Sequence, residues 1–287
     1  MNEVLEQLQT LWLTYNTVVF GLGVYGLLGL SVGLTLSCGV LSLASAAFMG
    51  IGAYTGSLLS LHTALPFPAV LATAMGGPAV VALLVGVPAL RLTGVYLAMA
   101  TLGFGEVLRI IILNLDITGG ALGLNSIPER TTGWHILVAV ALVLAFLQRL
   151  KNSRFGRAWE AVREDEVAAS VQGIDVQGLR LNAFVLSAAI AGLAGCLHAH
   201  YTYSISAGNY GFEAAVDYLT MAVLGGIAGL PGPLIGAAIL TLLPEVLRGL
   251  AELRTAVSGT ILILVILYLP HGLYDPRRWR SWLGRTT

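Results

Sequence analysis

The hydrophobic and polar positions of this chain fall into long blocks. Residues 7–90 contain no Asp, Glu, Lys or Arg, and the apolar runs show no two-residue alternation. A soluble core cannot hide every side chain of such a run, whereas a membrane accepts apolar helices of about 20 residues one after another. Such helices satisfy their backbone hydrogen bonds internally. The pattern predicts an all-α polytopic membrane protein.

Polar residues, glycine and proline divide the blocks into candidate helices. Segment 214–228 is too short to span a membrane and runs into "GGIAGLPGP", so we expect a broken or re-entrant element there. We therefore expect about eight transmembrane helices plus this element, in a single membrane domain over residues 1–287. The candidate segments are 11–33, 38–60, 68–89, 94–113, 133–150, 179–202, 214–228, 232–250 and 256–270.

Two glycine-interrupted segments, near 38–60 and 214–240, lie in opposite halves of the chain. Paired broken segments of this kind favour a transporter built from inverted repeats around a central path. The two segments share little beyond glycine, however. Glycine used only for close helix packing explains them equally well.

Composition and charge agree with the membrane class and suggest an orientation. Hydrophobic residues make up 56% of the chain and charged residues 10%, against about 25% charged in soluble domains. Nine of the thirty charged residues lie between Arg149 and Glu166. Basic residues concentrate in cytoplasmic loops. Placing this loop and the basic tail 275–287 in the cytoplasm puts eleven of the fifteen Lys and Arg there, with the N-terminus outside.

The charged stretch predicts one short helix of about four turns between Gly156 and Gly173, with Gly173 as its C-terminal stop. An alanine-rich face with Trp159 beside it suits a groove on a partner protein. An ordinary solvated loop helix explains the stretch equally well. The residues of this candidate docking helix are Arg157, Ala158, Trp159, Glu160, Ala161, Val162, Arg163, Ala168, Ala169 and Gly173.

The stretch "SRFGRAWEAVREDEVAASVQGIDV" resembles the coupling loop of permeases in branched-chain amino-acid ABC importers, the LivM-like branch. Ala168, Ala169 and Gly173 reproduce the Ala-Ala-x-x-x-Gly core of that loop. The segments "GVYLAMATLGFGEVLRIIILN", "TGGALGLNSIP", "LAGLAGCLHAHY", "MAVLGGIAGLPGPLIGAA" and "LYLPHGLYDP" resemble family signatures in family order. The resemblance makes residues 151–178 the loop that contacts an ATPase.

The resemblance implies a permease subunit of the bacterial inner membrane that imports branched-chain or similar hydrophobic amino acids. It implies a second homologous permease, two cytoplasmic ATPases and an extracytoplasmic solute-binding protein as partners. Val40, Ala44 and Ser45 replace the Gln, Gly and His common in the family, which removes two polar groups and leaves the substrate open. Urea or short amides remain alternative substrates, because urea importers use permeases similar to these. The single lysine, Lys151, belongs to no GxxxxGK[ST] phosphate loop, so we expect no ATPase activity and no cofactor in this chain.

Polar or helix-breaking residues at membrane depth are candidates for the translocation path or its gate. Glu106 and Arg109 share a helix face and either pair with each other or line the path. The outer run around Thr118 either presents backbone groups to a zwitterionic solute or is only a turn. The path or gate candidates are Glu106, Arg109, Thr118, Gly119, Gly120, Gly225, Gly226, Pro231 and Pro233.

The remaining polar residues receive structural interpretations. His198 and His200 lie on nearly opposite helix faces, which does not suit a shared metal ion, and no metal site is expected. Glu213 and Asp217 share a face at a solvated entrance. Cys38 and Cys196 are expected to be packing residues. An ion-coupled secondary transporter remains an alternative, although it would want a free titrating carboxylate at depth and Glu106 has Arg109 beside it.

Overall fold

The computed structural model describes residues 2–226, 229–246 and 273. Apart from an isolated bridge between Leu124 and Ile205, these residues contain no strand, which confirms the all-α class. The elements are α1 (Asn2–Ser37), α2 (Ser45–His62), α3 (Phe67–Ala89), α4 (Gly94–Asn114), η1 (Asp116–Thr118), η2 (Gly120–Leu122), α5 (Gly133–Lys151), α6 (Arg154–Glu164), α7 (Glu166–Val171), α8 (Val176–Thr202), η3 (Ala207–Tyr210), α9 (Phe212–Gly225) and α10 (Pro231–Val246).

Five of the described helices are long and apolar enough to cross a membrane: residues 16–37 of α1, and α3, α4, α5 and α8. The ends expected for α3, α4 and α5 lie within one residue of those observed, because polar or proline-containing loops bound each apolar run. Helices α2, α9 and α10 are shorter, with 18, 14 and 16 residues. The expected helix at 256–270 and the tail at 275–287 lie outside the described residues.

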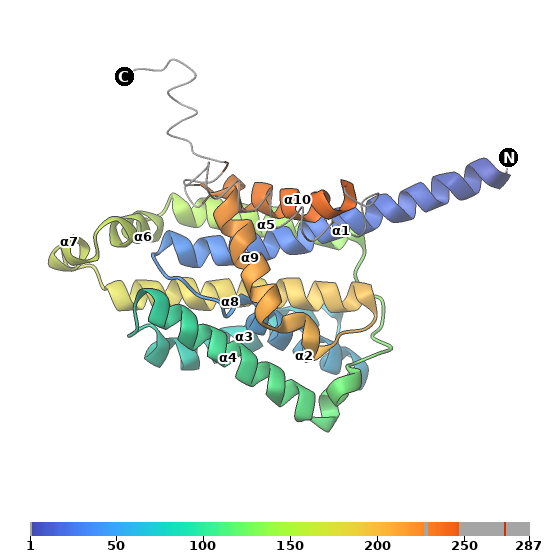
Figure 1. Ribbon diagram of the computed structural model, residues 1–287, viewed down its shortest axis with the longest axis horizontal. Helices are drawn as coiled ribbons and strands as arrows, with labels where there is room; N and C mark the ends of the chain where they lie inside the picture. Colours follow the sequence, from blue (N-terminus) through green and yellow to red (C-terminus); the bar gives the residue numbers. More distant parts are fainter. Residues whose placement is uncertain (1, 227–228, 247–272, 274–287) are drawn as a thin grey trace, which may run out of the picture.

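Helix α8 forms the centre of the bundle, packed against α1, α2 and α3 (Figure 1). The hydroxyl of Ser31 on α1 donates to the carbonyl oxygen of Ser187 on α8 at 2.8 Å. A Cβ atom at Gly52 on α2 would clash with the backbone of Gly192 on α8. Small residues and interhelical hydrogen bonds are what bring helix backbones together in lipid.

Helix α2 corrects one expectation about the second span. The helix begins at Ser45 rather than near residue 38, and it runs without a break through its three glycines. The glycines therefore serve close packing here, as the simpler explanation held. Residues 38–44 are not helical, and the backbone N–H of Leu43 donates to the hydroxyl of Thr101 on α4 at 3.0 Å. Irregular backbone in a membrane protein is tolerated where protein surrounds it in this way.

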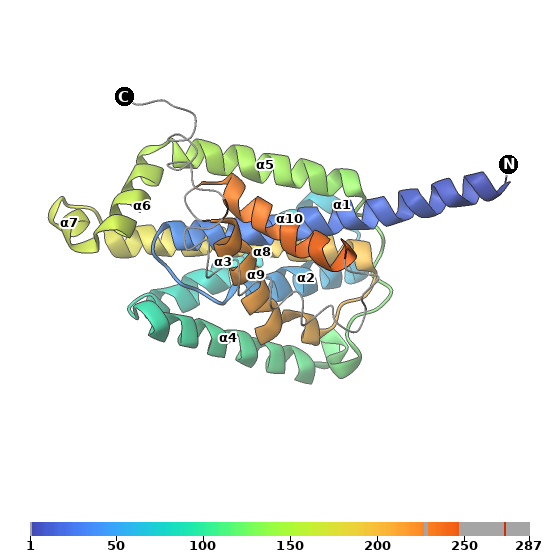
Figure 2. The ribbon, with the colours of Figure 1, turned by 45° about the horizontal axis from the view of Figure 1, so that its top comes forward.

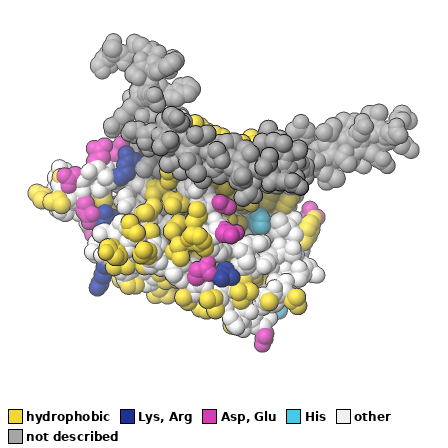
Figure 3. Space-filling model, in the orientation of Figure 1, with side chains coloured by type: hydrophobic (Ala, Val, Ile, Leu, Met, Phe, Trp, Pro, Cys, Tyr) yellow, Lys and Arg dark blue, Asp and Glu magenta, His cyan; other side chains and the backbone are white. Residues whose placement is uncertain are grey.

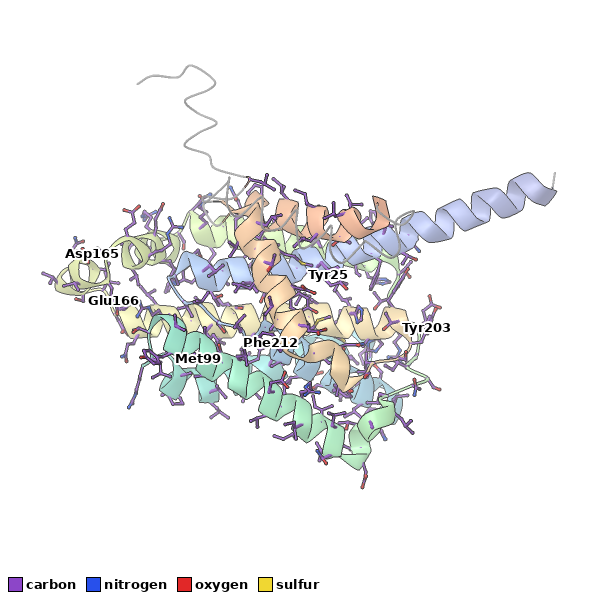
Figure 4. The ribbon with its side chains drawn as sticks, in the orientation of Figure 1. Tyr25, Met99, Asp165, Glu166, Tyr203 and Phe212 are labelled. Carbon is purple, nitrogen blue, oxygen red and sulfur yellow. The ribbon has the colours of Figure 1, made fainter. Side chains whose placement is uncertain are left out.

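The two ends of the bundle carry different loops. Helices α6 and α7 project at one end, and the described start of α1 lies at the other (Figures 1 and 2). Asp165 and Glu166 mark the first end and Tyr203 the second (Figure 4). At the second end, the guanidinium of Arg130 donates to the carbonyl oxygen of Leu65 at 3.1 Å, which ties two loops together.

Candidate functional site

The candidate docking helix is two helices rather than one. Helix α6 ends at Glu164 and α7 begins at Glu166, with an extended backbone at Asp165 between them. The carboxylate of Asp165 accepts hydrogen bonds of 2.9 Å from the backbone N–H groups of Val167 and Ala168. An aspartate in this role starts a new helix, which is why continuous helix formers still produce a corner. The stop expected at Gly173 follows α7, and Gly173 has a φ of 80°.

The largest side chain of the candidate docking helix faces inward. Trp159 is only 5% exposed, and its indole N–H donates to the carbonyl oxygen of Leu179 on α8 at 3.2 Å. The idea that Trp159 enters a groove on a partner protein is therefore wrong for this structure, because the side chain is already buried against α8 of its own chain. Of the expected residues, Trp159, Val162 and Ala169 are buried, Ala158 and Arg163 are half-buried, and Arg157, Glu160, Ala161, Ala168 and Gly173 are exposed.

Helix α7 is fixed by an ion pair with α8. Both guanidinium Nη atoms of Arg180 donate to the carboxylate of Glu166, at 2.9 and 2.7 Å. The arrangement leaves Val167 and Val171 pointing away from the bundle, 71% and 83% exposed. These two valines were missed because they lie outside the alanine-rich face.

The path candidates Gly225, Gly226, Pro231 and Pro233 lie where α9 ends and α10 begins. Gly226 has a φ of 94°, which side chains disfavour. A Cβ atom at Gly225 of α9 would clash with the backbone of Gly232 of α10, so these two short helices touch backbone to backbone. The break expected from the Gly-Pro run is confirmed, and it lies between two helices shorter than a full span.

A small cavity joins this break to α6. Its volume is about 70 Å³, and it is lined by Trp159, Glu160 and Arg163 on one side and by Gly229, Leu230 and Pro233 on the other. Residues of α1 and α5 complete its wall. The candidate docking residues on α6 and the Gly-Pro break between α9 and α10 are about 70 residues apart in sequence. They are therefore neighbours in space.

Glu106 and Arg109 pair with each other and also hold the start of α9. The Nε of Arg109 donates to one carboxylate oxygen of Glu106 at 2.8 Å. The backbone N–H of Phe212 donates to the other oxygen at 2.9 Å. Figure 4 shows Phe212 where α9 starts, beside α4. A carboxylate at a helix N-terminus satisfies a free N–H group and meets the positive end of the helix dipole.

The outer run around Thr118 is a pair of tight turns. Thr118 is buried, and its hydroxyl donates to the carbonyl oxygen of Leu115 at 2.7 Å, so the hydroxyl serves the turn itself. Gly119 and Gly120 have φ values of 76° and 55°, as turn glycines do. The simpler explanation, a turn, accounts for these three residues.

A larger cavity was not expected from the sequence. It has a volume of about 630 Å³ and lies among α1, α2, α8, η3, α9 and α10. Glu213 and Asp217, which the sequence suggested lie at a solvated entrance, line it together with His198 and Tyr210. The only sequence signal was two carboxylates four residues apart in a short apolar helix. No group of three potential metal ligands comes together in the described part of the chain.

His200 and the two cysteines are structural. His200 is buried, with its Nε2 2.8 Å from the hydroxyl of Ser60 and its Nδ1 2.8 Å from the carbonyl oxygen of Cys196. Cys38 and Cys196 are buried and unpaired with each other. Both observations agree with the packing roles expected from the sequence.

Comparison with known proteins gives a consistent result. Residues 15–267 match the family described as the permease component of branched-chain amino acid transport systems. The chain is 34% identical to the high-affinity branched-chain amino acid transport system permease protein LivM of Escherichia coli, over 93% of this chain and 69% of that protein. It is 36% identical to LivH of the same organism over 48% of this chain and 45% of LivH. A probable LivM of Methanocaldococcus jannaschii is 28% identical over 62% of this chain and 59% of that protein. No solved structure matches the chain.

Proposed function

The chain belongs to the family of branched-chain amino acid transport system permease components, and on that premise we propose that it forms half of the translocation path of an ATP-driven importer. The proposed substrates are branched-chain or similar hydrophobic amino acids. The match to LivM along nearly the whole chain carries this proposal. It favours amino acids over urea or amides, and a transport subunit over an ion-coupled carrier that works alone.

A homologous second permease is the proposed partner within the membrane. The chain matches both LivM and LivH, which are named as permease proteins of a branched-chain amino acid transport system in one organism. Two ATPases and an extracytoplasmic solute-binding protein complete the proposed assembly. The charge pattern supports an orientation with α6, α7 and the C-terminus in the cytoplasm and the N-terminus outside. Basic residues gather at the end of α5 and on α6, namely Arg149, Lys151, Arg154 and Arg157.

The proposed ATPase contact is the outer surface of α6 and α7. Val167 and Val171 offer exposed apolar side chains beyond the membrane helices, and Glu160 and Arg157 provide a charged rim. An apolar centre with a polar rim is the usual anatomy of a protein interface. Trp159, with its hydrogen bond to Leu179, supports this surface from behind.

The test is ATP-dependent uptake by the complete assembly, co-purified from the source membrane and reconstituted with its binding protein. Val167→Asp with Val171→Asp should abolish uptake and release the ATPases, while the chain still inserts and melts normally. Val167→Leu with Val171→Leu, which keeps both exposed side chains apolar, is the matched control. Unchanged uptake in the double variant would refute the docking surface. Uptake by the purified chain alone, driven by an ion gradient without ATP, would refute the importer.

A further inference from the structure

The 630 Å³ cavity is built around α9. Its wall combines Tyr25 of α1, His198 of α8, Tyr210 of η3 and three turns of α9. The aromatic rings of Tyr25 and Tyr218 lie 6.2 Å apart across the space between α1 and α9, and Figure 4 shows Tyr25 on α1 where α9 crosses it. Pockets for small molecules have volumes of about 300–1,000 Å³. The cavity is large enough for one amino acid.

Two carboxylates of the wall have no charge partner among the residues that the structure describes. Glu213 and Asp217 lie four residues apart and so share one face of α9. Both side chains are exposed, and the ion pairs formed among the described residues involve other carboxylates. Acidic side chains are seen above the yellow apolar surface of the face that carries α4 and α9 (Figure 3). Charges at membrane depth face water or another protein rather than lipid.

Buried polar atoms of the same wall also lack partners. Tyr210 is 2% exposed, and its hydroxyl has no hydrogen-bond partner among the described residues. The Nδ1 atom of His198 is also buried and has no hydrogen-bond partner among the described residues. The hydroxyl of Tyr218 donates at 3.3 Å to the sulfur of Met49, which is a weak acceptor. Buried polar groups are normally satisfied, so these atoms indicate a partner other than the described residues.

The chemistry of the wall selects a cation. Two carboxylates and several phenol rings accept hydrogen bonds from an ammonium group and attract its charge. Among the described residues, those that line the cavity include no Lys or Arg. Arg109, the cation of the neighbouring α4, is already paired with Glu106. A substrate carboxylate therefore finds no counter-charge in this wall, whereas a substrate amine finds two.

We propose that this cavity binds the α-ammonium group of the amino acid in transit, with Glu213 and Asp217 as its charge partners and the hydroxyl of Tyr210 as a further acceptor. The proposal rests on the proposed function of the chain. Glu213 lies in the first turn of α9, near the positive end of the helix dipole. The carboxylate end of the substrate is left to groups outside this wall.

The experiment uses the full reconstituted assembly with Glu213→Gln, Asp217→Asn and the double variant. At saturating loaded binding protein, we expect the double variant to lower kcat for uptake by about tenfold or more, because hydrogen bonds to a charged group are lost. KM should change little, since the binding protein captures the substrate first. Glu213→Asp, which keeps the charge, should retain most of the rate. Asp116→Asn, an outer carboxylate outside this cavity, is the matched control.

Direct binding to the assembly without the binding protein identifies the ligand group. Leucine should bind the wild type and 4-methylpentanoate, which lacks only the amine, should not compete, and the double variant should lose this difference. If the two compounds compete equally, or if replacing sodium by choline removes the effect of the variants, the amine assignment is wrong. If the double variant transports like Asp116→Asn, the cavity is not on the path. If the wild-type assembly itself takes up no amino acid, the proposed function fails instead.

Discussion

The carboxylate of Glu106 on α4 accepts a 2.9 Å hydrogen bond from the backbone N–H of Phe212, the first residue of α9. The same carboxylate is paired with Arg109 at 2.8 Å. Helix α9 spans about 20 Å from this cap to the Gly-Pro break, which lies beside α6. Helix α9 is therefore held at its start by an ion pair, and the Gly-Pro break that follows its end borders α6.

Replacing Glu106 should loosen the start of α9. Glu106→Ala leaves both the N–H of Phe212 and the Arg109 charge without a partner, and we expect a loss of about 2 kcal/mol in stability. Glu106→Gln keeps an acceptor for Phe212 and should cost less. Thermal unfolding in detergent measures both, with Asp116→Asn as the control. Equal melting temperatures for the alanine variant and the wild type would show that the cap contributes nothing.

Trp159→Ala should act on folding before it acts on coupling. The ring is buried against α8, and truncating a buried aromatic residue costs about 3–5 kcal/mol. Val171→Ala, at an exposed position of the neighbouring α7, should leave stability unchanged. The yield of folded protein and its melting temperature are the measurements. A stable Trp159→Ala protein that fails only in ATP-driven uptake would return Trp159 to the docking surface.

The sequence predicted α3, α4 and α5 well and the corner at Asp165 poorly, for a physical reason. Long apolar runs bounded by polar or proline-containing loops define α3, α4 and α5 to within one residue. Asp165 lies among good helix formers, and only its side-chain bonds to Val167 and Ala168 reveal a new start. The large cavity was missed because it needs the packing of five elements around α9, which no local pattern contains.

The ion pair between Glu166 and Arg180 should determine how firmly α7 is held. Its bidentate geometry is good, but Glu166 is about half exposed, so we expect Arg180→Ala to cost at most about 1 kcal/mol. The loss should be local, because α7 has only six residues and little else to hold it. Faster amide hydrogen exchange over residues 166–171, with unchanged exchange in α8, is the expected result. If residues 166–171 exchange at the same rate in the variant and the wild type, the ion pair does not hold α7, and the cap at Asp165 does so without it.

Both cysteines should resist labelling in the folded protein. Cys38 and Cys196 are buried, and burial raises the pKa of the Cys38 thiol, just beyond the end of α1, so little reactive thiolate forms near pH 8. Maleimide should label neither residue before denaturation and both afterwards. A Val171→Cys variant, 83% exposed at its position, serves as the positive control. Rapid labelling of Cys38 in the native protein would show that the segment after α1 opens to solvent.

Filling the 70 Å³ cavity between α6 and the Gly-Pro break should separate stability from transport. Leu30 of α1 is buried and lines this cavity, so Leu30→Phe places a larger apolar side chain into existing space. We expect an unchanged or higher melting temperature together with uptake slowed several-fold, because the break loses room to shift when α6 is displaced by its ATPase. Leu84→Phe on the exposed side of α3 is the control with the same chemical change. Normal uptake by a stabilised Leu30→Phe protein would mean that α9 and α10 move without using this space. The contact between α6 and the Gly-Pro break would then serve packing alone.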